Sequence, residues 1–275
     1  DPANTGAVCL AMPQDVEGEA YDYPVSFFKK RIWRLERRPA TEAALAEAAE
    51  AIRAAKKPML ICGGGVRYAE AHAELRHFVE ATGIPFADTQ AGKSAIEWDH
   101  PLALGGVGVT GCSAANEIAK EADLVIGVGT RYTDFTTSSK WLWSDACKFV
   151  NINVSEFQSL KMDAVPVVAD AKDALPRLEK LLEGYKPAYT SEVRDAQARW
   201  REELARLDAV IFEDTPDWTP IINDANADSA KRFAKDVKAG LCQTTVLGAL
   251  NAWMADTDVA IGAAGSLPGD MQRMW

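Results

Sequence analysis

Three glycine-containing stretches of this sequence have the composition of phosphate-binding loops. They are Gly63-Gly64-Gly65, residues 87–94 (Ala-Asp-Thr-Gln-Ala-Gly-Lys-Ser) and residues 263–270 (Ala-Ala-Gly-Ser-Leu-Pro-Gly-Asp). Glycines let backbone N–H groups approach a phosphate closely, and the start of a following helix adds a favourable partial charge. The same residues also form ordinary tight turns, so each stretch must be judged by the elements around it.

The first stretch lies between a predicted strand and a predicted helix, where open α/β sheets bind phosphates. It lacks the third glycine of the dinucleotide fingerprint, because Gly65 is followed by Val66-Arg67-Tyr68. We therefore interpret it as a tight strand-to-helix turn. It is also the first place to expect a nucleotide, should this part of the chain bind one.

The second stretch nearly spells a P-loop, but Ala87 replaces the first glycine and Asp88 places a carboxylate where phosphate would be received. The following connection, up to Pro101, is too short for the long helix that such a loop requires. We expect no ATP or GTP here. The third stretch joins a predicted strand to a helix start, and a diphosphate cradle and a simple Gly/Pro turn remain equally open for it.

Other polar residues form no further chemical pattern. Arg131 could meet an anion or pair with Asp134, and the sequence does not decide between the two roles. His72 and His77 are five residues apart, which is not the spacing of a shared metal on a helix. The cysteines have neither zinc nor redox spacing, and no activated serine or cysteine stands out. The sequence therefore predicts no catalytic residue and no metal ligand.

Composition excludes several classes of protein. The chain has 275 residues, 48% hydrophobic and 25% charged, as expected for a globular protein. Its net charge of −10 disfavours nucleic acid as a partner, and no apolar run is long enough to cross a membrane. Cys9, Cys62 and Cys147 lie in apolar runs, so we expect buried, reduced thiols and a cytoplasmic protein.

The elements that would position these loops alternate between strand and helix, as in a parallel α/β sheet of the Rossmann-like kind. Apolar runs predict strands at 58–62, 84–87, 123–128, 148–153 and 165–168. Periodic apolar positions predict helices at 41–57, 69–82, 114–121, 171–183, 190–208 and 243–254. Residues 213–228 are rich in Asp, Asn, Pro and Thr, which is typical of a linker.

Two further runs, residues 6–12 and 258–264, are predicted as strands without predicted neighbours. A parallel strand needs partners for its backbone groups, so we expect these runs to belong to flanking domains of a longer protein. The resulting division places the end of one domain at 1–24, a linker at 25–39, a middle domain at 40–184, a linker with a helix at 185–239 and the start of a third domain at 240–275.

Together these stretches resemble the acetolactate-synthase-like class of thiamine-diphosphate enzymes. The likeness is carried by residues 12–16, 82–85 and 122–131 and covers nearly the whole chain. It implies that residues 1–24 close a pyrimidine-binding domain and that residues 240–275 open a diphosphate-binding domain. It also implies that cofactor-binding residues lie in the third loop: Gly265, Ser266, Leu267 and Gly269.

Within the class, residues 13–24 and residues 243–248, leading into 263–270, are similar to members that hydrolyse a cyclic 1,2-dione in inositol breakdown. That likeness implies thiamine diphosphate and Mg²⁺ as cofactors, a small cyclic dione as substrate and a homo-oligomer, either dimer or tetramer. The activating glutamate and the metal motif of the class have no counterpart in this sequence, so we expect the chain by itself to be inactive. Residues 132–135 (Tyr-Thr-Asp-Phe) depart from the Phe-Asp-Asp-Arg of flavin-binding members, so we expect no flavin.

Three alternatives stay open at this stage. One is an acetolactate-synthase-like carboligase that joins two ketoacids. Another is a nucleotide-binding module of the NAD type that uses the loop at Gly63. In the third, the middle domain only spaces two catalytic domains and supports subunit contacts.

Overall fold

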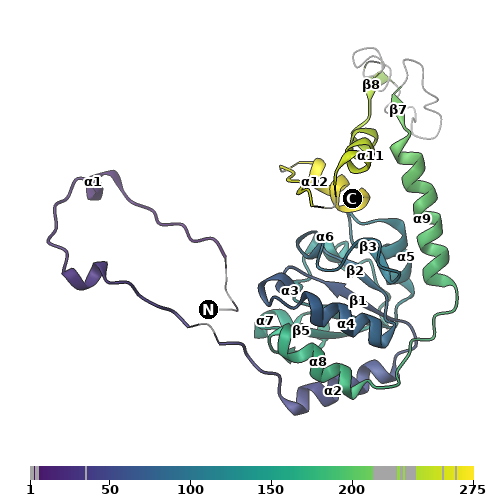
Figure 1. Ribbon diagram of the computed structural model, residues 1–275, viewed down its shortest axis with the longest axis horizontal. Coiled ribbons are helices and arrows are strands. Elements are labelled where there is room, and N and C mark those ends of the chain that lie inside the picture. Colours follow the sequence, from purple (N-terminus) through teal and green to yellow (C-terminus); the bar gives the residue numbers. More distant parts are fainter. Residues whose placement is uncertain are drawn as a thin grey trace.

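The computed structural model describes residue 3 and residues 6–34, 36–212, 228–229, 232, 240–255, 257–263 and 265–275. An N-terminal segment, residues 8–34, extends away from the folded body (Figure 1). It contains two short helical turns, α1 (Gln14–Glu17) and η2 (Val25–Phe28), neither of which has a buried residue. The body begins at the residues just before α2 (Glu42–Ala54).

The centre of the body is one parallel sheet of six strands. The strands are β1 (Pro58–Cys62), β2 (Phe86–Asp88), β3 (Ala103–Gly106), β4 (Leu124–Val128), β5 (Lys148–Asn153) and β6 (Val165–Val168). Their order is β3-β2-β1-β4-β5-β6, and Leu60 of β1 is in register with Phe86 on one side and Ile126 on the other. From β1 the chain adds strands on one side, and from β4 it adds them on the other side. The topological switch point therefore lies between β1 and β4.

Helices cover both faces of the sheet, as a parallel sheet requires (Figure 1). The face that includes Leu60 packs against α2, α4 (His72–Thr82) and α8 (Ala171–Leu181). The face that includes Met59 and Ile61 packs against α5 (Ser113–Glu121) and the first part of α9 (Glu192–Asp208). Successive β1 side chains point to opposite faces, so a continuously apolar strand supplies both cores.

Local sequence fixes the ends of several helices. The Thr41 side chain accepts a hydrogen bond from the backbone N–H of Ala44 at 3.2 Å and caps α2. Gly83 ends α4 in the left-handed conformation at φ 74°. The Asp170 carboxylate caps α8 by accepting from the backbone N–H of Lys172 at 2.9 Å.

Shorter elements connect and extend this core. They are α3 (Gly65–Tyr68), η3 (Gln90–Gly92), α6 (Asp134–Thr137), α7 (Glu156–Ser159), η4 (Lys161–Asp163), the antiparallel pair β7 (Ile211–Phe212) and β8 (Gly240–Leu241), α11 (Gln243–Trp253) and α12 (Leu267–Met274). In the part of the chain that the structure describes, no helix has the length and apolar character needed to cross a bilayer.

The predicted Rossmann-like parallel sheet is confirmed, and β1 and β5 have the predicted bounds. The sequence did not predict β3, whose four residues include two glycines. The helix predicted over 69–82 starts only at His72, after the short turn of α3.

The strands predicted at the two terminal runs were wrong for the described residues. Residues 6–12 and 258–263 have no strand beside them and do not adopt strand structure. Val8 is 93% exposed and Cys9 is exposed rather than buried, because the N-terminal segment packs against no core. Neither run completes the six-stranded sheet. The linker predicted over 213–228 lies almost entirely outside the described residues.

Candidate functional site

A crevice opens at the carboxyl edge of the sheet, at the switch point between β1 and β4. It has a volume of about 1010 Å³ and is lined by residues of the loops after β1, β2, β4 and β5, by Asp170 before α8 and by Gln272 of α12. Ligands of open α/β sheets bind in this place, because the loops after the two central strands diverge there. The crevice is therefore the candidate binding site of the six-stranded domain.

The glycines after β1 are required by close packing between two loops. A Cβ atom on Gly63 would lie 2.3 Å from the backbone oxygen of Gly129, and one on Gly65 would lie 2.6 Å from the Cα atom of Gly129. Gly129 itself has φ 62°, a conformation that favours glycine. The tight turn inferred from the sequence thus has a direct physical cause, and it forms the floor of the crevice.

Charged residues of both signs surround the crevice. Arg37 forms ion pairs of 3.0 Å with Asp170 and with Glu70, which ties the chain before α2 to the start of α8. No ion pair between Arg131 and Asp134 is found among the described residues, although Lys161 donates a hydrogen bond to the Arg131 backbone oxygen at 2.8 Å. The sequence left two roles open for Arg131, and the structure does not show the pairing with Asp134.

The stretch that nearly spells a P-loop has a different role. Asp88 ends β2, the chain then forms the η3 turn, and no helix follows Ser94 directly. A Cβ atom on Gly92 would lie 2.1 Å from the backbone oxygen of Cys62, so this loop packs tightly over the end of β1. Burial raises the pKa of the Asp88 carboxyl from 3.8 to about 7, against an opposing effect of Lys93. A buried carboxyl group at this point is incompatible with a phosphate nest.

Tyr132, at the position that departs from the flavin-binding members, is a core residue. It is 7% exposed, and its ring makes edge contacts with Trp143 and Phe149. Its hydroxyl would lie 2.1 Å from a Cβ atom on Gly127, so the glycine in β4 makes room for it. Burial raises the pKa of Tyr132. The ring therefore packs in the core on the face of the sheet that includes Met59 and Ile61, and the expected absence of flavin stays a prediction.

The four residues assigned to the cofactor lie at the start of α12, outside the six-stranded sheet. Gly265 has φ 115° and open space around its Cα atom. The N–H groups of Ser266 and Leu267 have no acceptor among the described residues, as expected in the first turn of a helix. Gly269 differs from these three, because its N–H donates to the Ser266 backbone oxygen at 3.0 Å and a Cβ atom on it would meet Thr110 at 2.9 Å. Gly269 therefore contributes to the packing of the helix, and the assignment of all four residues to the cofactor stays a prediction.

A divalent metal does not fit the residues described. Within them, no group of three or more His, Cys, Asp or Glu side chains could hold a metal ion. In α12, the Asp270 carboxylate accepts a hydrogen bond from Nε2 of Gln243, and its Oδ1 atom lies 3.8 Å from an Arg273 guanidinium nitrogen. A metal partner for the diphosphate would have to come from residues other than those described.

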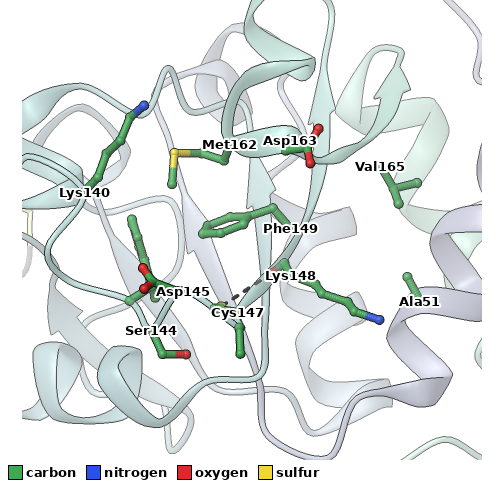
Figure 2. Close-up of a pocket in the computed structure, with 12 residues that line it drawn as sticks. Ala51, Lys140, Ser144, Asp145, Cys147, Lys148, Phe149, Met162, Asp163 and Val165 are labelled. Atoms are coloured by element: carbon green, nitrogen blue, oxygen red, sulfur yellow. Dashed lines mark hydrogen bonds between the residues drawn. The ribbon is translucent and has the colours of Figure 1, made fainter.

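A second cavity, of about 640 Å³, lies at the opposite edge of the sheet, beside the amino ends of β5 and β6 (Figure 2). Cys147 points into it and donates a weak hydrogen bond to the Lys148 backbone oxygen at 3.5 Å. Burial raises the pKa of this thiol to about 12, so it is not a reactive thiolate at neutral pH. The cavity lies at the edge of the sheet opposite to the crevice.

Residues 45–178 match the family described as the central domain of thiamine pyrophosphate enzymes, another name for thiamine-diphosphate enzymes. The match contains all six strands of the parallel sheet. Residues 45–178 thus form a domain of that family.

More particular likenesses extend over the whole chain. It is 53% identical over 278 aligned residues to "3D-(3,5/4)-trihydroxycyclohexane-1,2-dione hydrolase 1" of Bacillus cereus. It is 52% identical to the 3D-(3,5/4)-trihydroxycyclohexane-1,2-dione hydrolase of Bacillus thuringiensis (strain Al Hakam) and 53% identical to that of Bacillus anthracis. In each case the alignment covers 100% of this chain and 43% of the relative. The chain thus spans less than half the length of these relatives.

Proposed function

We propose that this chain is part of a thiamine-diphosphate enzyme that opens the ring of a cyclic 1,2-dione by hydrolysis, as a step of inositol breakdown. One observation carries the proposal: identity of 53% extends over the whole chain. A likeness confined to residues 45–178 would support a central domain of any member of the family. The actual likeness also includes the loop at Gly265 and the residues before Pro24.

The residues of this chain would bind and orient the cofactor rather than carry out the reaction. When bound, thiamine diphosphate would supply a nucleophilic thiazolium carbon and an electron-accepting ring, the two functions that cleavage of a C–C bond next to a carbonyl group needs. The N–H groups of Ser266 and Leu267, beside the open turn at Gly265, can donate to the diphosphate oxygens. Mg²⁺, which we also propose as a cofactor, would take its ligands from residues beyond those described.

An assay of the whole enzyme tests the proposal. Purified full-length protein, stripped of cofactor, is supplied with thiamine diphosphate and Mg²⁺ together with either the trihydroxycyclohexane-1,2-dione or pyruvate. We expect ring opening that depends on both cofactors and no acetolactate from pyruvate. Acetolactate formation without ring opening would replace the proposal by the carboligase alternative. NAD binding without any thiamine-diphosphate dependence would replace it by the nucleotide-binding module.

We further propose that the whole enzyme is a cytoplasmic homo-oligomer, either a dimer or a tetramer. All five cysteines are free thiols, which is consistent with a reducing compartment. The exposed aromatic residues of the N-terminal segment are consistent with contacts to other parts of an assembly. Light scattering of the full-length protein should give a mass of two or four subunits, and a monomeric mass would contradict this assignment.

A further inference from the structure

Helix α12 is attached to the six-stranded domain by a buried glutamine. Gln272 is 4% exposed although it lies on an eight-residue helix near the surface. Its side-chain Nε2 donates to the Val107 backbone oxygen at 3.2 Å, and its Oε1 accepts from the Thr110 hydroxyl at 2.5 Å. Both partners belong to the loop between β3 and α5. The carboxamide thus uses a donor and an acceptor on the same loop.

Additional contacts hold α12 in the same position. Lys93 donates to the Gln272 backbone oxygen at 3.5 Å, and Gln90 donates to the Pro268 backbone oxygen at 3.3 Å. Two glycines permit the close approach: a Cβ atom on Gly106 would lie 2.8 Å from the Gln272 side chain, and one on Gly269 would lie 2.9 Å from Thr110. The contact therefore involves the loops after β2 and β3 and both ends of α12.

The position of α12 determines the position of the loop that precedes it. Ser266 is the residue immediately before the helix, and Gly265 and Leu267 flank it. Gln272, five residues after Leu267, also lines the crevice at the switch point. Because a helix is rigid over so short a length, fixing Gln272 fixes the direction of the N–H groups at its start.

We propose that Gln272 is a positioning residue for the cofactor: its buried carboxamide docks α12 on the β3 side of the central domain and so holds residues 265–267 where the diphosphate binds. This inference rests on the proposed function, because it takes the loop at Gly265 as the diphosphate site. It gives the central domain a part in cofactor binding that a passive spacer would not have.

The chain contains a matched control. Gln197 of α9 is also buried, at 9% exposure, and its Nε2 donates to the backbone oxygens of Pro101 and Ala103 at 3.0 and 2.8 Å. It attaches a helix to the same β3 region, and no hydrogen bond joins it to α12 among the described residues. Gln197→Leu and Gln272→Leu therefore remove similar hydrogen bonds, and only the second loosens the loop at Gly265.

The first measurement uses the full-length enzyme. For wild type and both variants, activity is titrated with thiamine diphosphate, and melting temperatures are recorded. We expect Gln272→Leu to raise the half-saturating cofactor concentration about tenfold, because unpaired buried groups reduce the docked population by about that factor. The kcat at saturating cofactor should stay within about twofold, since excess cofactor restores the docked state. Gln197→Leu should lower the melting temperature without changing the cofactor requirement.

A second measurement does not depend on activity. Hydrogen exchange of this chain, without cofactor, should show faster exchange at the amides of residues 271–275 in Gln272→Leu than in Gln197→Leu. Gly106→Ala adds a methyl group whose nearest neighbours are all atoms of Gln272, so it should displace α12 without deleting any hydrogen-bonding group. Gly106→Ala should therefore also raise the half-saturating cofactor concentration and speed hydrogen exchange at residues 271–275.

The outcomes separate the two proposals. Wild-type activity that is independent of thiamine diphosphate would overturn the proposed function. Cofactor-dependent wild-type activity with an unchanged cofactor requirement in Gln272→Leu and Gly106→Ala would overturn only the positioning role. An equal rise of the half-saturating cofactor concentration in Gln197→Leu would also overturn the positioning role, because the rise would then reflect a general loss of stability.

Discussion

Asp88 is a carboxyl group that the fold keeps away from water beside the candidate crevice. It is 7% exposed, its Oδ1 atom has no hydrogen-bond partner within the described structure, and its pKa is raised from 3.8 to about 7 by burial. Lys93 and Cys62 are the titratable groups that interact with it electrostatically. At neutral pH the folded chain must either protonate this group or hold a buried charge.

This predicts that stability falls as the pH rises. Between pH 4 and 7 the folded state keeps the Asp88 proton while the unfolded state has lost it, so the free energy of unfolding decreases over this window and levels off above it. The full effect is at most about 4 kcal/mol, at 1.36 kcal/mol per pKa unit. Denaturant unfolding of Asp88→Asn should lose this slope and show higher stability than wild type at pH 8. An identical slope in both proteins would contradict the prediction.

The glycines of the turn after β1 allow a second prediction. Gly63→Ala would place its Cβ atom 2.3 Å from a backbone oxygen, which cannot move aside as a side chain can, whereas Gly64→Ala would lie 3.1 Å from the Ala91 side chain. We expect a loss of about 3 kcal/mol or more for Gly63→Ala, the upper range for overpacking, and about 1 kcal/mol for Gly64→Ala. Urea unfolding of the two variants measures the difference, and equal losses would refute the packing explanation.

At the scale of residues, the sequence supported some interpretations and concealed others. Glycines between a strand and a helix indicated a tight turn, because only a few conformations connect these elements so closely. The raised pKa of Asp88 comes from burial in the folded structure, and the docking role of Gln272 depends on a contact with Val107, 165 positions away in the chain. No local pattern distinguishes Gln272 from an exposed glutamine, so only the folded structure identifies it.

At the scale of elements, prediction succeeded where both faces of a strand are buried. The run from Pro58 to Cys62 is apolar throughout because β1 lies in the middle of the sheet, and its bounds followed from the sequence alone. β3 lies at the edge of the sheet, and only every second residue of it is fully buried. It also contains Gly105 and Gly106, so its sequence lacks the continuous apolar run that predicts a strand. The terminal runs were apolar enough to be strands, but strand structure also requires a neighbour.

The start of α8 allows a prediction at the same scale. Asp170 caps the helix and also pairs with Arg37, which connects this helix to the chain before α2. Asp170→Asn keeps a cap acceptor and loses the charge, whereas Asp170→Ala loses both. We expect a cost of about 2 kcal/mol for Ala and about 1 kcal/mol for Asn, from typical values for caps and charge-assisted hydrogen bonds. Thermal unfolding measures both, and an Asn variant as unstable as the Ala variant would show that the cap contributes nothing.

At the scale of the whole molecule, the six-stranded domain and the N-terminal segment differ in how they bury apolar residues. Phe78 and Leu45 are fully buried in the core, whereas Tyr23, Phe27 and Phe28 of the segment contact mainly one another and remain more than half exposed. The alternation of strands and helices and the resemblance to thiamine-diphosphate enzymes predicted a parallel Rossmann-like domain, whereas the order of its strands came from the structure. The sequence could not predict where the segment lies, because its aromatic rings contact mainly one another and remain exposed.

This difference predicts which part of the molecule determines its stability. The double substitution Phe27→Ser with Phe28→Ser removes two rings that are 59% and 71% exposed, so little burial is lost and the midpoint of thermal unfolding should be unchanged. Phe78→Ala, a single change at a fully buried ring, should cost about 3–5 kcal/mol. Binding of a dye for exposed apolar surface should fall in the double variant, since the aromatic cluster supplies much of that surface. A double variant that unfolds as early as Phe78→Ala would mean that these rings pack on the body in solution, and the segment would then belong to the domain's core.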